Sequence, residues 1–488
     1  MTWQDKRVTV AGLGVSGLPA ARVLHGLGAV VTVVNEGDDA RSRAQAAELE
    51  ALGVTVRLGD ATLLPEGTEL VVTAPGWRPD KPLFRAAAAA GVPVWGDVEL
   101  AWQLRDLNGR KPAPWLAVTG TNGKTTTVRM LASILRAAGL RTAAVGNIGV
   151  SLLDAVLGDE PYDVLAVELS SYQLHWAPSL RVHSAAVLNI APDHLDWHGS
   201  LAAYAADKGR VYEGNSVACV YNVADPATEE LVRAADVEEG CRAIGFTLGA
   251  PGPSQLGVVD GILVDRAFVA DRHKQAQELA EVTDIGRPPA RHPSPAGASR
   301  PPVAAPHNIA NALAAAALAR GFGVEPAAVR DGLRDFRPDA HRIEHVDEVA
   351  GVTFIDDSKA TNTHAAEASL AAYDPIVWIA GGLAKGARFD DLVIGAAKRL
   401  RGVVLIGAER ALIAEALARH APEVPVVDLD RTDTGAMSAA VREAARLARP
   451  GDTVLLAPAC ASMDMFANYN KRGEAFADAV RELAAETD

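Results

Sequence analysis

The segment from Trp115 to Gly139, WLAVTGTNGKTTTVRMLASILRAAG, constrains the fold of this 488-residue chain more than any other feature. A short apolar run enters a loop with two glycines, and a helix-forming stretch follows that we expect to end at Gly139. Gly-Lys-Thr at the start of a helix is the core of a P-loop, whose N–H groups and lysine hold phosphates. The full pattern has glycine where this chain has Val118, so the loop is a variant. A strand, loop and helix in this order predict a parallel α/β sheet.

Similar alternations of β-branched apolar runs and helical stretches occur on both sides of this loop. Such runs are typical of buried parallel strands in βαβ units. At about 150 residues per domain, the length suggests roughly three domains. We predict an α/β chain of three domains: an N-terminal Rossmann-like domain (1–97), a central P-loop ATPase-like domain (98–337) and a C-terminal Rossmann-like domain (338–488). The strand candidates are Arg7 to Ala11, Val30 to Asn35, Glu69 to Gly76, Asp163 to Leu169, Ala185 to Ile190, and runs beginning at Val352, Pro375, Gly402 and Asp452.

The composition excludes several classes of protein. The formal net charge is -14, with 47 Lys+Arg against 61 Asp+Glu, which argues against nucleic-acid binding by a basic surface. No apolar run approaches the roughly 18 residues that span a bilayer, and the start MTWQDKRVTV lacks the apolar core of a secretory signal. Cys219, Cys241 and Cys460 are too dispersed for a metal cluster or a disulfide framework. We expect a soluble protein of the cytoplasm.

The segment from Gly286 to Pro302, GRPPARHPSPAGASRPP, has a different composition from its surroundings. It carries six prolines and no aromatic or large aliphatic residue. Such a segment cannot bury enough apolar surface to offset the entropy of ordering, so it is predicted to be a flexible loop.

A second glycine-rich loop, Gly12 to Gly17 (GLGVSG), lies near the N-terminus. It fits G-x-G-x-x-G between a strand and a helix, and Glu36 lies near the end of the next strand, about where a ribose-binding carboxylate would sit. Glycines let the backbone approach a diphosphate at the helix N-terminus. A tight turn that binds nothing remains an alternative, and a dinucleotide and another diphosphate-linked nucleotide are not separable here.

Candidate metal ligands follow two strands downstream of the P-loop. Glu168 ends one strand, and His194, within the sequence Asp193-His194-Leu195-Asp196, follows another. Loops at the carboxyl ends of parallel strands bind ligands, and a nucleoside triphosphate needs Mg²⁺ with hard oxygen ligands. The alternatives are that Glu168 caps a helix and that 193–198 is a solvated turn. From composition alone, Lys208 on a helical stretch is a surface lysine.

These motifs and several others resemble those of the Mur ligases of peptidoglycan synthesis, in the same order and over essentially the whole chain. The motifs that carry the resemblance are TGTNGKTT (Thr119 to Thr126), GNIG (Gly146 to Gly149), ELSSYQL (Glu168 to Leu174), DHLDWH with the later Lys208, HNIANAL (His307 to Leu313), DDSKATN (Asp356 to Asn362), GGLAKG (Gly381 to Gly386) and PACASMDMF (Pro458 to Phe466).

Within the family, the chain is most similar to the members that add D-glutamate to UDP-N-acetylmuramoyl-L-alanine. GLGVSG and the stretch from Leu455 to Phe476 indicate this, and the DNPR-type motif of the diaminopimelate-adding members is absent from the sequence. The resemblance implies ATP-dependent amide formation through an acyl phosphate. It implies ATP, the UDP-linked acid and D-glutamate as substrates, two Mg²⁺ sites, no nucleic-acid or membrane partner, and a monomer.

The resemblance also assigns roles to individual residues. Catalytic roles fall on Lys124, His194, Lys208 and Lys359. The UDP-substrate contacts are Gly14, Val15, Ser16, Asn35, Glu36, Gly76 and Asn147. The ATP contacts are Gly120, Thr121, Asn122, Gly123, Lys124, Thr125, Thr126, Asn308, Asn311, Arg342 and Asp357.

The resemblance places metal and acceptor contacts in the same way. The magnesium ligands are Thr125, Glu168, His194 and Lys208, whose amine is carbamylated by CO₂ in this family and so becomes an anionic oxygen donor. The D-glutamate contacts are Thr361, Lys385, Ser462, Met463 and Tyr469. Because Ser462 takes the site position, we expect Cys460 to be a packed, neutral thiol.

Three alternatives remain open. Another Mur-type ligase that adds L-alanine shares most of the motifs. An NAD-dependent dehydrogenase would use the Gly12 to Gly17 loop and Glu36, but it leaves the P-loop and the C-terminal third unexplained. A P-loop NTPase that acts as a switch or assembly factor leaves Lys208, Lys359 and Ser462 without a task.

Overall fold

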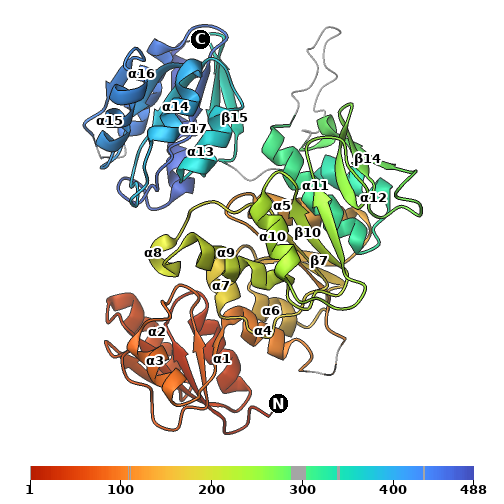
Figure 1. Cartoon of the computed structure of the whole chain (residues 1–488). Coiled ribbons are helices and arrows are strands. Elements are labelled where there is room, and N and C mark those ends of the chain that lie inside the picture. Colours follow the sequence, from red (N-terminus) through yellow and green to blue (C-terminus); the bar gives the residue numbers. More distant parts are fainter. Residues whose placement is uncertain are drawn as a thin grey trace. The chain divides into compact units, whose positions relative to one another are not determined.

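The computed structural model describes residues 2–107, 109, 111–286, 304–337, 341–431, 433 and 435–487. The chain divides into two compact units, one of Met1–Ala304 with Asn308–Phe336 and one of Ala305–His307 with Arg337–Asp488. The first unit contains two sheets and the second contains one, which confirms the predicted α/β class with three sheets (Figure 1). The domain limits at 97/98 and 337/338 stay predictions. The predicted flexible loop lies outside the described residues, apart from Gly286.

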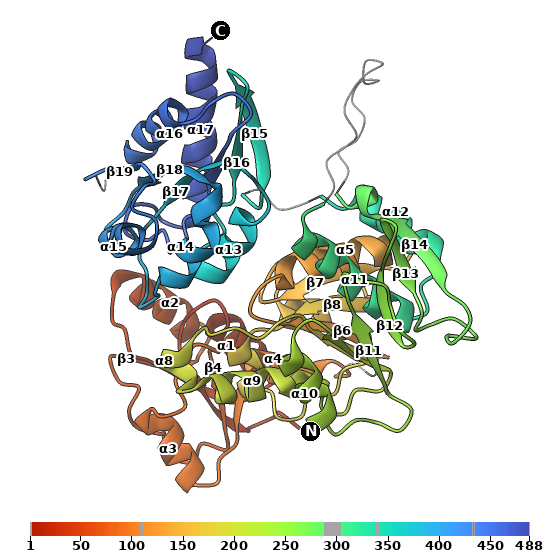
Figure 2. The ribbon, with the colours of Figure 1, turned by 45° about the horizontal axis from the view of Figure 1, so that its top comes forward.

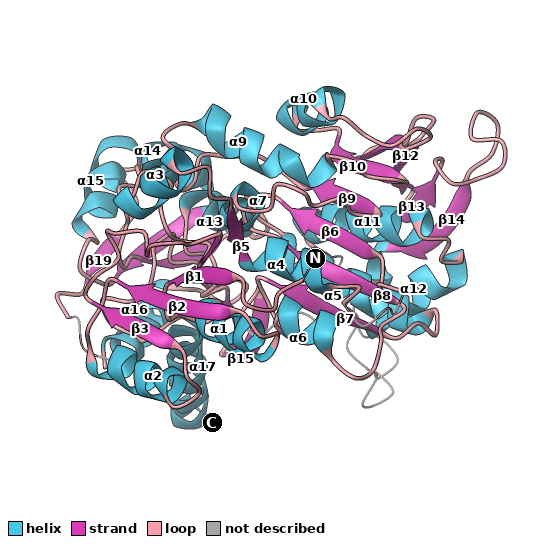
Figure 3. Ribbon diagram, turned by 90° about the horizontal axis from the view of Figure 1, so that it is seen from below, coloured by secondary structure: helices cyan, strands magenta, loops and turns pink. Residues whose placement is uncertain are grey.

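The first sheet is fully parallel, with the strand order β3-β2-β1-β4-β5 in the described chain. Strands β1, β2 and β3 lie side by side in Figure 3. Its strands are β1 (Arg7–Ala11), β2 (Val30–Asn35), β3 (Thr55–Leu58), β4 (Leu70–Thr73) and β5 (Val94–Gly96). Its helices are α1 (Gly17–Gly26), α2 (Ala40–Glu50), α3 (Pro82–Ala89) and α4 (Asp97–Leu104). The central strands β1 and β4 are buried on both faces, which explains why their sequences are continuously apolar.

The second sheet has the order β14-β13-β12-β11-β10-β9-β6-β8-β7 among the described residues. The strands from β7 to β12 run parallel, whereas β13 and β14 are antiparallel additions at one end, as Figure 2 shows. Its strands are β6 (Trp115–Thr119), β7 (Thr142–Gly146), β8 (Val164–Glu168), β9 (Ser184–Val187), β10 (Ala218–Asn222), β11 (Arg242–Phe246), β12 (Gln255–Val259), β13 (Ile262–Asp265) and β14 (Gln277–Glu281).

The helices of this part of the chain pack on the second sheet. One of them carries Gly332, which lies against α5 (Lys124–Ala137), the helix that follows the P-loop. Gly332 lies so close to α5 that an added Cβ would be 2.4 Å from the Cα of Ile134, and Ser133 Oγ donates to Gly332 O at 2.7 Å. The helices are α5 (Lys124–Ala137), α6 (Leu152–Leu157), α7 (Ser171–His175), α8 (Leu195–His198), α9 (Leu201–Gly209), α10 (Pro226–Ala234), α11 (Pro306–Gly321) and α12 (Pro326–Asp335), with 3-10 turns at Arg210–Tyr212 and Val282–Asp284.

The predicted end of α5 is confirmed. Gly139 follows the helix with φ of +77°, and its N–H donates to Arg136 O at 2.9 Å. A residue with a Cβ is strained at this φ, so glycine is the favoured helix stop.

The third sheet has the order β15-β16-β20-β17-β18-β19 in the described part of the second unit, and only β15 is antiparallel to its neighbour. The strands predicted near Val352, Pro375, Gly402 and Asp452 correspond to β16, β17, β18 and β20. Its strands are β15 (Glu344–Val349), β16 (Val352–Asp356), β17 (Ile376–Ala380), β18 (Leu400–Leu405), β19 (Val426–Asp428) and β20 (Thr453–Leu456). Its helices are α13 (Thr363–Leu370), α14 (Asp390–Ala396), α15 (Ala411–His420), α16 (Ala436–Leu447) and α17 (Tyr469–Thr487), with a 3-10 turn at Ala397–Arg399.

None of the helices in the described ranges combines the length and the apolar character that a membrane span requires.

Candidate active site

The P-loop connects β6 to α5 and has the backbone that its glycines permit. Gly120 and Gly123 have φ of +151° and +84°, and Gly123 is the N-cap of α5. Lys124 Nζ donates to Gly120 O and Thr121 O, each at 2.8 Å, so its ammonium lies over the loop. The helix N-terminus and this ammonium together form a site for an anion.

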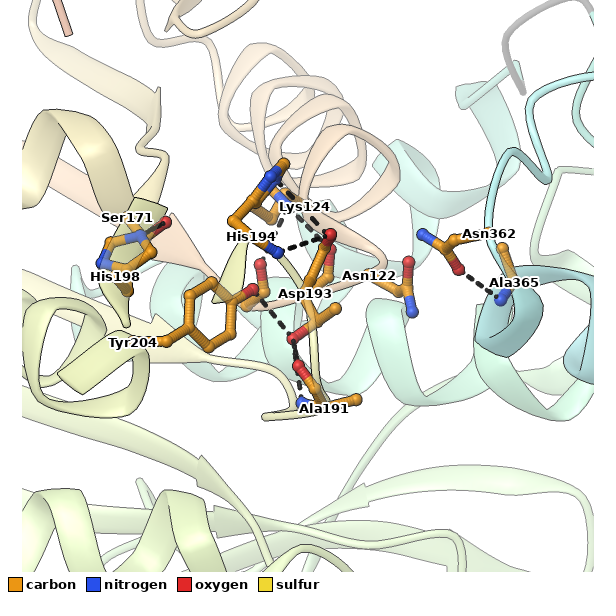
Figure 4. A network of polar contacts seen from close by, with 12 residues as sticks. Asn122, Lys124, Ser171, Ala191, Asp193, His194, His198, Tyr204, Asn362 and Ala365 are labelled. Atoms are coloured by element: carbon orange, nitrogen blue, oxygen red, sulfur yellow. Dashed lines mark hydrogen bonds and ion pairs between the residues drawn. The ribbon is translucent and has the colours of Figure 1, made fainter. Parts of the chain in front are cut away.

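The P-loop is held in place by residues that follow β9. Thr121 N donates to Asn189 O at 2.9 Å, and Asn122 N donates to Asn189 Oδ1 at 2.8 Å. The hydroxyls of Thr121 and Tyr204 lie 3.0 Å apart, and Figure 4 shows Tyr204 directed toward the loop. Asn189 was not among the predicted site residues, although its place after a strand next to the P-loop strand could have indicated it.

The amide of Asn311, from α11, packs against the P-loop. An added Cβ on Gly123 would lie 2.4 Å from Asn311 Oδ1, and Asn311 Nδ2 contacts Asn308 Oδ1 at 3.5 Å. The two asparagines predicted to contact ATP are therefore neighbours, and Asn311 touches the loop.

Glu168, the last residue of β8, presents an unpaired carboxylate oxygen. Asn147 Nδ2 donates to Oε1 at 2.9 Å, and the side chain is buried, but Oε2 has no hydrogen-bond partner among the described residues. The alternative that Glu168 caps a helix is wrong, because Ser170 and Gln173 form the capping box of α7. A buried carboxylate oxygen that accepts no hydrogen bond is well placed to bind a cation.

Lys208 is buried, so the surface position that composition indicated is wrong. It lies on the face of α9 that packs against the P-loop, with 2% of its surface exposed. Its Nζ donates to Gly120 O at 2.9 Å and lies 3.4 Å from Thr119 Oγ1. Burial, and then the charge of Lys124, hold the pKa of Lys208 well below its usual value, which favours the neutral amine.

His194 immediately precedes α8 and has φ of +52°. Its Nε2 lies 3.5 Å from Asp193 Oδ2, as Figure 4 shows. Burial is the main cause that lowers the pKa of His194; Asp193 raises it, and the charges of Lys208 and Lys124 lower it. The alternative of a solvated turn over 193–198 holds in part: His194, Leu195 and Asp196 are exposed, but 195–198 form α8 and the side chain of His198 is buried.

Asp207, which the sequence did not indicate, joins the three helices around this site. Its carboxylate contacts His175 Nδ1 at 2.9 Å, His198 Nδ1 at 3.0 Å and Arg210 Nε at 3.2 Å, and its side chain is 10% exposed. His198 Nε2 lies 3.0 Å from Ser171 Oγ. An aspartate beside a lysine on a helix is usually solvated, so the residue types carried no signal for this network.

The N-terminal glycine loop is tied down by polar side chains. Leu13 N donates to Asn35 Oδ1 at 3.1 Å, and Ser16 Oγ donates to Asp97 Oδ2 at 2.8 Å. Burial raises the pKa of Asp97, although the Ser16 bond opposes this. Val15 is 87% exposed at the tip of the loop.

Two other predicted UDP contacts lie close to this sheet's carboxyl edge. Glu36 pairs with Lys81, and Gly76 O accepts a hydrogen bond from Trp197 Nε1 at 3.1 Å. The second contact joins the loop after β4 directly to α8.

In the second unit, the loop after β16 carries a buried carboxylate and a lysine. Burial raises the pKa of Asp357 to about 6, whereas the Ser369 hydroxyl, which donates to it, and the charge of Arg342 lower it. Lys359 Nζ lies 5.1 Å from the ring centre of Tyr469, a cation–π distance.

The loops after β17 and β20 run together in the same unit. Leu383 and Ala461 exchange two backbone hydrogen bonds of 2.9 Å, and an added Cβ on Gly382 would lie 2.2 Å from Ala461 O. The loop of Lys385, which is exposed with φ of +50°, therefore lies beside that of Ser462.

In the loop after β20, neighbouring side chains differ in exposure. Ser462 is buried and Met463 is 65% exposed. Cys460 is buried, and burial raises its pKa to about 12, so the expected neutral thiol is confirmed.

Two family models match most of this chain. Residues 118–319 match the Mur ligase middle domain, and residues 341–460 match the Mur ligase, glutamate ligase domain. The chain belongs to the Mur ligase family. Mur ligases are ATP-dependent, amide-bond-forming ligases that use Mg²⁺, and this chain is such an enzyme.

Relatives extend this family match over the full length. The chain is 81% identical over 483 residues to the UDP-N-acetylmuramoylalanine--D-glutamate ligase of Streptomyces coelicolor, covering 99% of both chains. It is 57% identical over 486 residues to the ligase of the same name from Thermobifida fusca, covering 99% of this chain and 100% of that one.

Solved Mur ligases share the fold. The MurF ligase of Thermotoga maritima, in complex with ADP, has a TM-score of 0.56 at 15% identity and covers 94% of this chain and 96% of its own. The UDP-N-acetylmuramate-alanine ligase of the same organism has a TM-score of 0.54 at 18% identity, covering 98% and 99%.

Proposed function

We propose that this Mur ligase adds D-glutamate to UDP-N-acetylmuramoyl-L-alanine in peptidoglycan precursor synthesis, with hydrolysis of ATP to ADP and phosphate. The observation that carries this proposal is the near-complete, 81% identity to a relative named for this reaction. We also propose, from the likeness to this relative, that the reaction takes place in the cytoplasm and that the enzyme acts as a monomer.

The first step activates the acid. The carboxylate of the L-alanyl group attacks the γ-phosphorus of ATP, the bond to the β–γ bridging oxygen breaks, and an acyl phosphate and ADP form. Catalysis of such a transfer is mainly positioning and charge stabilisation. Lys124 can move from its carbonyl partners to the outer phosphates, while the N–H groups of 120–126 hold the phosphate chain.

The second step forms the amide. The amine of D-glutamate attacks the acyl carbon, a tetrahedral intermediate forms, and phosphate leaves as the carbonyl is restored while the nitrogen loses its proton. A carboxylate alone is a poor acyl donor, so phosphorylation supplies the leaving group. The ammonium of Lys359 is a suitable group to stabilise the negative charge that develops on the acyl phosphate.

The residues around the P-loop fit the magnesium that the family uses. Glu168 Oε2 is a buried carboxylate oxygen without a partner in the described chain, and Thr125 lies in the first turn of α5. When bound there, Mg²⁺ supplies neutralisation of the charge on the transferring phosphate. His194, kept neutral by its environment, is a suitable nitrogen ligand for a second site.

We extend this proposal to carbamylation of Lys208. An ammonium cannot bind a cation, but a neutral amine can add to CO₂, which gives an anionic carbamate and releases one proton. Burial and the nearby charge of Lys124 favour the neutral amine that this reaction needs. The carbamate oxygens would then complete the ligand set with His194.

The N-terminal loop and Asn147 form the proposed site for the UDP-linked acid. Gly14, Val15, Ser16, Asn35, Glu36 and Gly76 lie on loops at one edge of the first sheet, where diphosphate-linked nucleotides bind in such folds. Asn147 lies 2.9 Å from Glu168, next to the phosphates of the proposed ATP site.

The proposed acceptor site uses the loops after β16, β17 and β20. D-Glutamate carries two carboxylates, which need cations and hydroxyl or backbone donors at fixed positions. Lys385, Thr361 and Ser462 supply these groups, with Met463 and Tyr469 beside them. The nucleotide contacts proposed for Arg342 and Asp357 belong to the same unit.

The test of this function is acceptor-dependent ADP release. With ATP, Mg²⁺ and UDP-N-acetylmuramoyl-L-alanine, D-glutamate should trigger turnover, and L-glutamate, L-alanine and meso-diaminopimelate should not. Preference for L-alanine when UDP-N-acetylmuramate is the acid would make the chain the L-alanine-adding ligase and contradict the proposal.

The acceptor site has its own test. Lys385→Ala should raise the KM for D-glutamate by about tenfold or more, since it removes a charged partner of a carboxylate, and it should leave the Kd for ATP unchanged. Lys398→Ala, a change of the same charge elsewhere in the second unit, is the matched control. Equal effects of the two substitutions would remove Lys385 from the acceptor site.

A further inference from the structure

A cavity of about 560 Å³ lies in the first unit, away from the P-loop. Its wall includes Arg242, the first residue of β11, and the loop from Ala267 to His273 after β13. The P-loop follows the carboxyl end of β6, and the sheet is parallel from β6 through β9 and β10 to β11. Arg242, at the amino end of its strand, is therefore at the opposite edge of the sheet from the ATP site.

Arg320, which lines this cavity, is neutralised by an ion pair with a buried aspartate. Arg320 Nε donates to Asp265 Oδ2 at 3.0 Å, and Asp265 is fully buried. Asp265 Oδ1 also accepts from Ala267 N at 2.7 Å and Phe268 N at 2.9 Å. The charge of Arg320 is thus already balanced, and its role is to fix the loop.

The loop on the wall is held by a second arginine. Arg266 donates to Pro251 O at 3.1 Å, to Arg272 O at 3.2 Å and to His273 O at 3.1 Å. These bonds fix the backbone that carries Arg272 and His273, so the wall is built before any ligand arrives.

Two guanidinium groups of the wall lack a carboxylate partner. Neither Arg242 nor Arg272 forms an ion pair within the described residues. Of the two acidic lining residues, Asp271 pairs with Lys274 at 3.8 Å, and Glu325 is exposed. Arg242 donates to Ala267 O at 2.6 Å and lies over the ring of Phe268. Burial lowers the pKa of Arg242, repulsion from the charge of Arg272 lowers it further, and the charge of Asp265 raises it.

We propose that this cavity binds a small organic anion through Arg242 and Arg272, by a phosphate or carboxylate group. Guanidinium groups hold both kinds of group with paired hydrogen bonds, and such an anion would relieve the repulsion between the two arginines. A volume of 560 Å³ is within the usual range for small-molecule sites. The lining carries three arginines and a histidine against two acidic residues, on a chain whose net charge is -14.

Hydrogen exchange on the full-length protein tests this site directly. Inorganic pyrophosphate and citrate serve as phosphate and carboxylate probes in Mg²⁺-free buffer, and a hexaglutamate peptide represents an acidic protein segment. We expect one small anion to protect peptides covering 267–274, and peptides covering 118–126 report P-loop binding separately. Protection by pyrophosphate alone identifies a phosphate site, and protection by citrate alone identifies a carboxylate site.

Two charge reversals complete the test. Arg272→Glu should weaken probe binding at 267–274 by about tenfold or more, and Arg233→Glu, an exposed arginine on α10, should not. Ligase turnover without probe should be unchanged in both variants, since neither residue belongs to the proposed catalytic machinery. Absence of protection by both small anions, protection by hexaglutamate alone, equal weakening in the two variants, or loss of turnover in Arg272→Glu would each overturn the proposal.

Discussion

The two glycine-rich loops of the first unit, Gly12 to Gly17 and Gly120 to Lys124, have the same local form but different surroundings. Each follows an interior strand that pairs in parallel with both of its neighbours, and each leads into a helix. The N-terminal loop is held by Asn35 and by Asp97, which accepts from Ser16 of the loop, and it has an exposed valine at its tip. The P-loop packs against a buried lysine, with a histidine and a partnerless carboxylate oxygen close by.

This difference separates binding from chemistry. A glycine loop at a helix N-terminus can hold a phosphate wherever it occurs. Around the P-loop, burial and nearby charges together shift the pKa values of Lys208 and His194, which is the usual mark of a reacting site. Beside the N-terminal loop, the pKa of Asp97 is shifted mainly by burial. The N-terminal loop is accordingly suited to hold the UDP-linked substrate, and the P-loop to the transfer of phosphate.

The largest effect should come from the buried lysine. Lys208→Ala should lower turnover by about a thousandfold, as expected when an electrostatic group of the reaction is lost. Lys81→Ala, beside the N-terminal loop, should change kcat by less than about twofold, because surface ion pairs contribute little. Steady-state ADP release at saturating substrates measures both.

A chemical rescue distinguishes loss of an anionic ligand from loss of packing. If Lys208 acts as a carbamate, added formate or acetate should restore part of the activity of Lys208→Ala. The same additions should restore no activity to Lys124→Ala. Full activity of Lys208→Ala in CO₂-depleted buffer would exclude the carbamate, and near-ultraviolet circular dichroism would identify a folding defect.

A glycine substitution in each loop should sharpen the contrast. Gly123→Ala should destabilise the fold by about 1–2 kcal/mol, because φ is +84° and the new Cβ would collide with Asn311. Gly14→Ala meets no atom within 4 Å, so its effect on stability should stay within about 0.5 kcal/mol. Urea denaturation with matched m-values measures both, and equal destabilisation would contradict the contacts described for the two loops.

The smallest effect concerns pH and the N-terminal loop. Because burial raises the pKa of Asp97, the folded state holds this proton more tightly than the unfolded state does. The contribution of Asp97 to the free energy of unfolding is therefore present at low pH, and it falls as pH rises from about 4 through the raised pKa. Asp97→Asn should flatten that fall, measured by urea denaturation at several pH values. An identical pH profile in the variant would show that Asp97 is not the group responsible.

Strong local patterns allowed much of the fold to be predicted. β1 and β2 have the predicted bounds, because continuous β-branched runs between turn residues have few other solutions. β13 and β14 were not predicted, because they are short and contain or adjoin polar residues. They form by pairing, β13 with β12 and β14 with β13, and the local sequence does not show such pairing.

The site was predictable only in part, for a related physical reason. The P-loop is local, so its glycines and Lys124 identify it in the sequence. The burial of Lys208 depends on which face of α9 meets the loop, and the role of Asp207 depends on histidines from two other helices. Such long-range juxtapositions leave no periodic trace in the chain.

The hydrogen bond from Trp197 to Gly76 has a thermodynamic consequence. Gly76 belongs to the proposed UDP-substrate site, and Trp197 lies on the short helix that begins directly after His194. A ligand that moves the loop of Gly76 must therefore also change the free energy of the loop around His194. By linkage, a ligand that moves the loop around His194 changes the free energy of the Gly76 loop by the same amount. If the proposed UDP-substrate site is correct, its occupancy and the order around His194 are coupled through one indole N–H, before either reaction step begins.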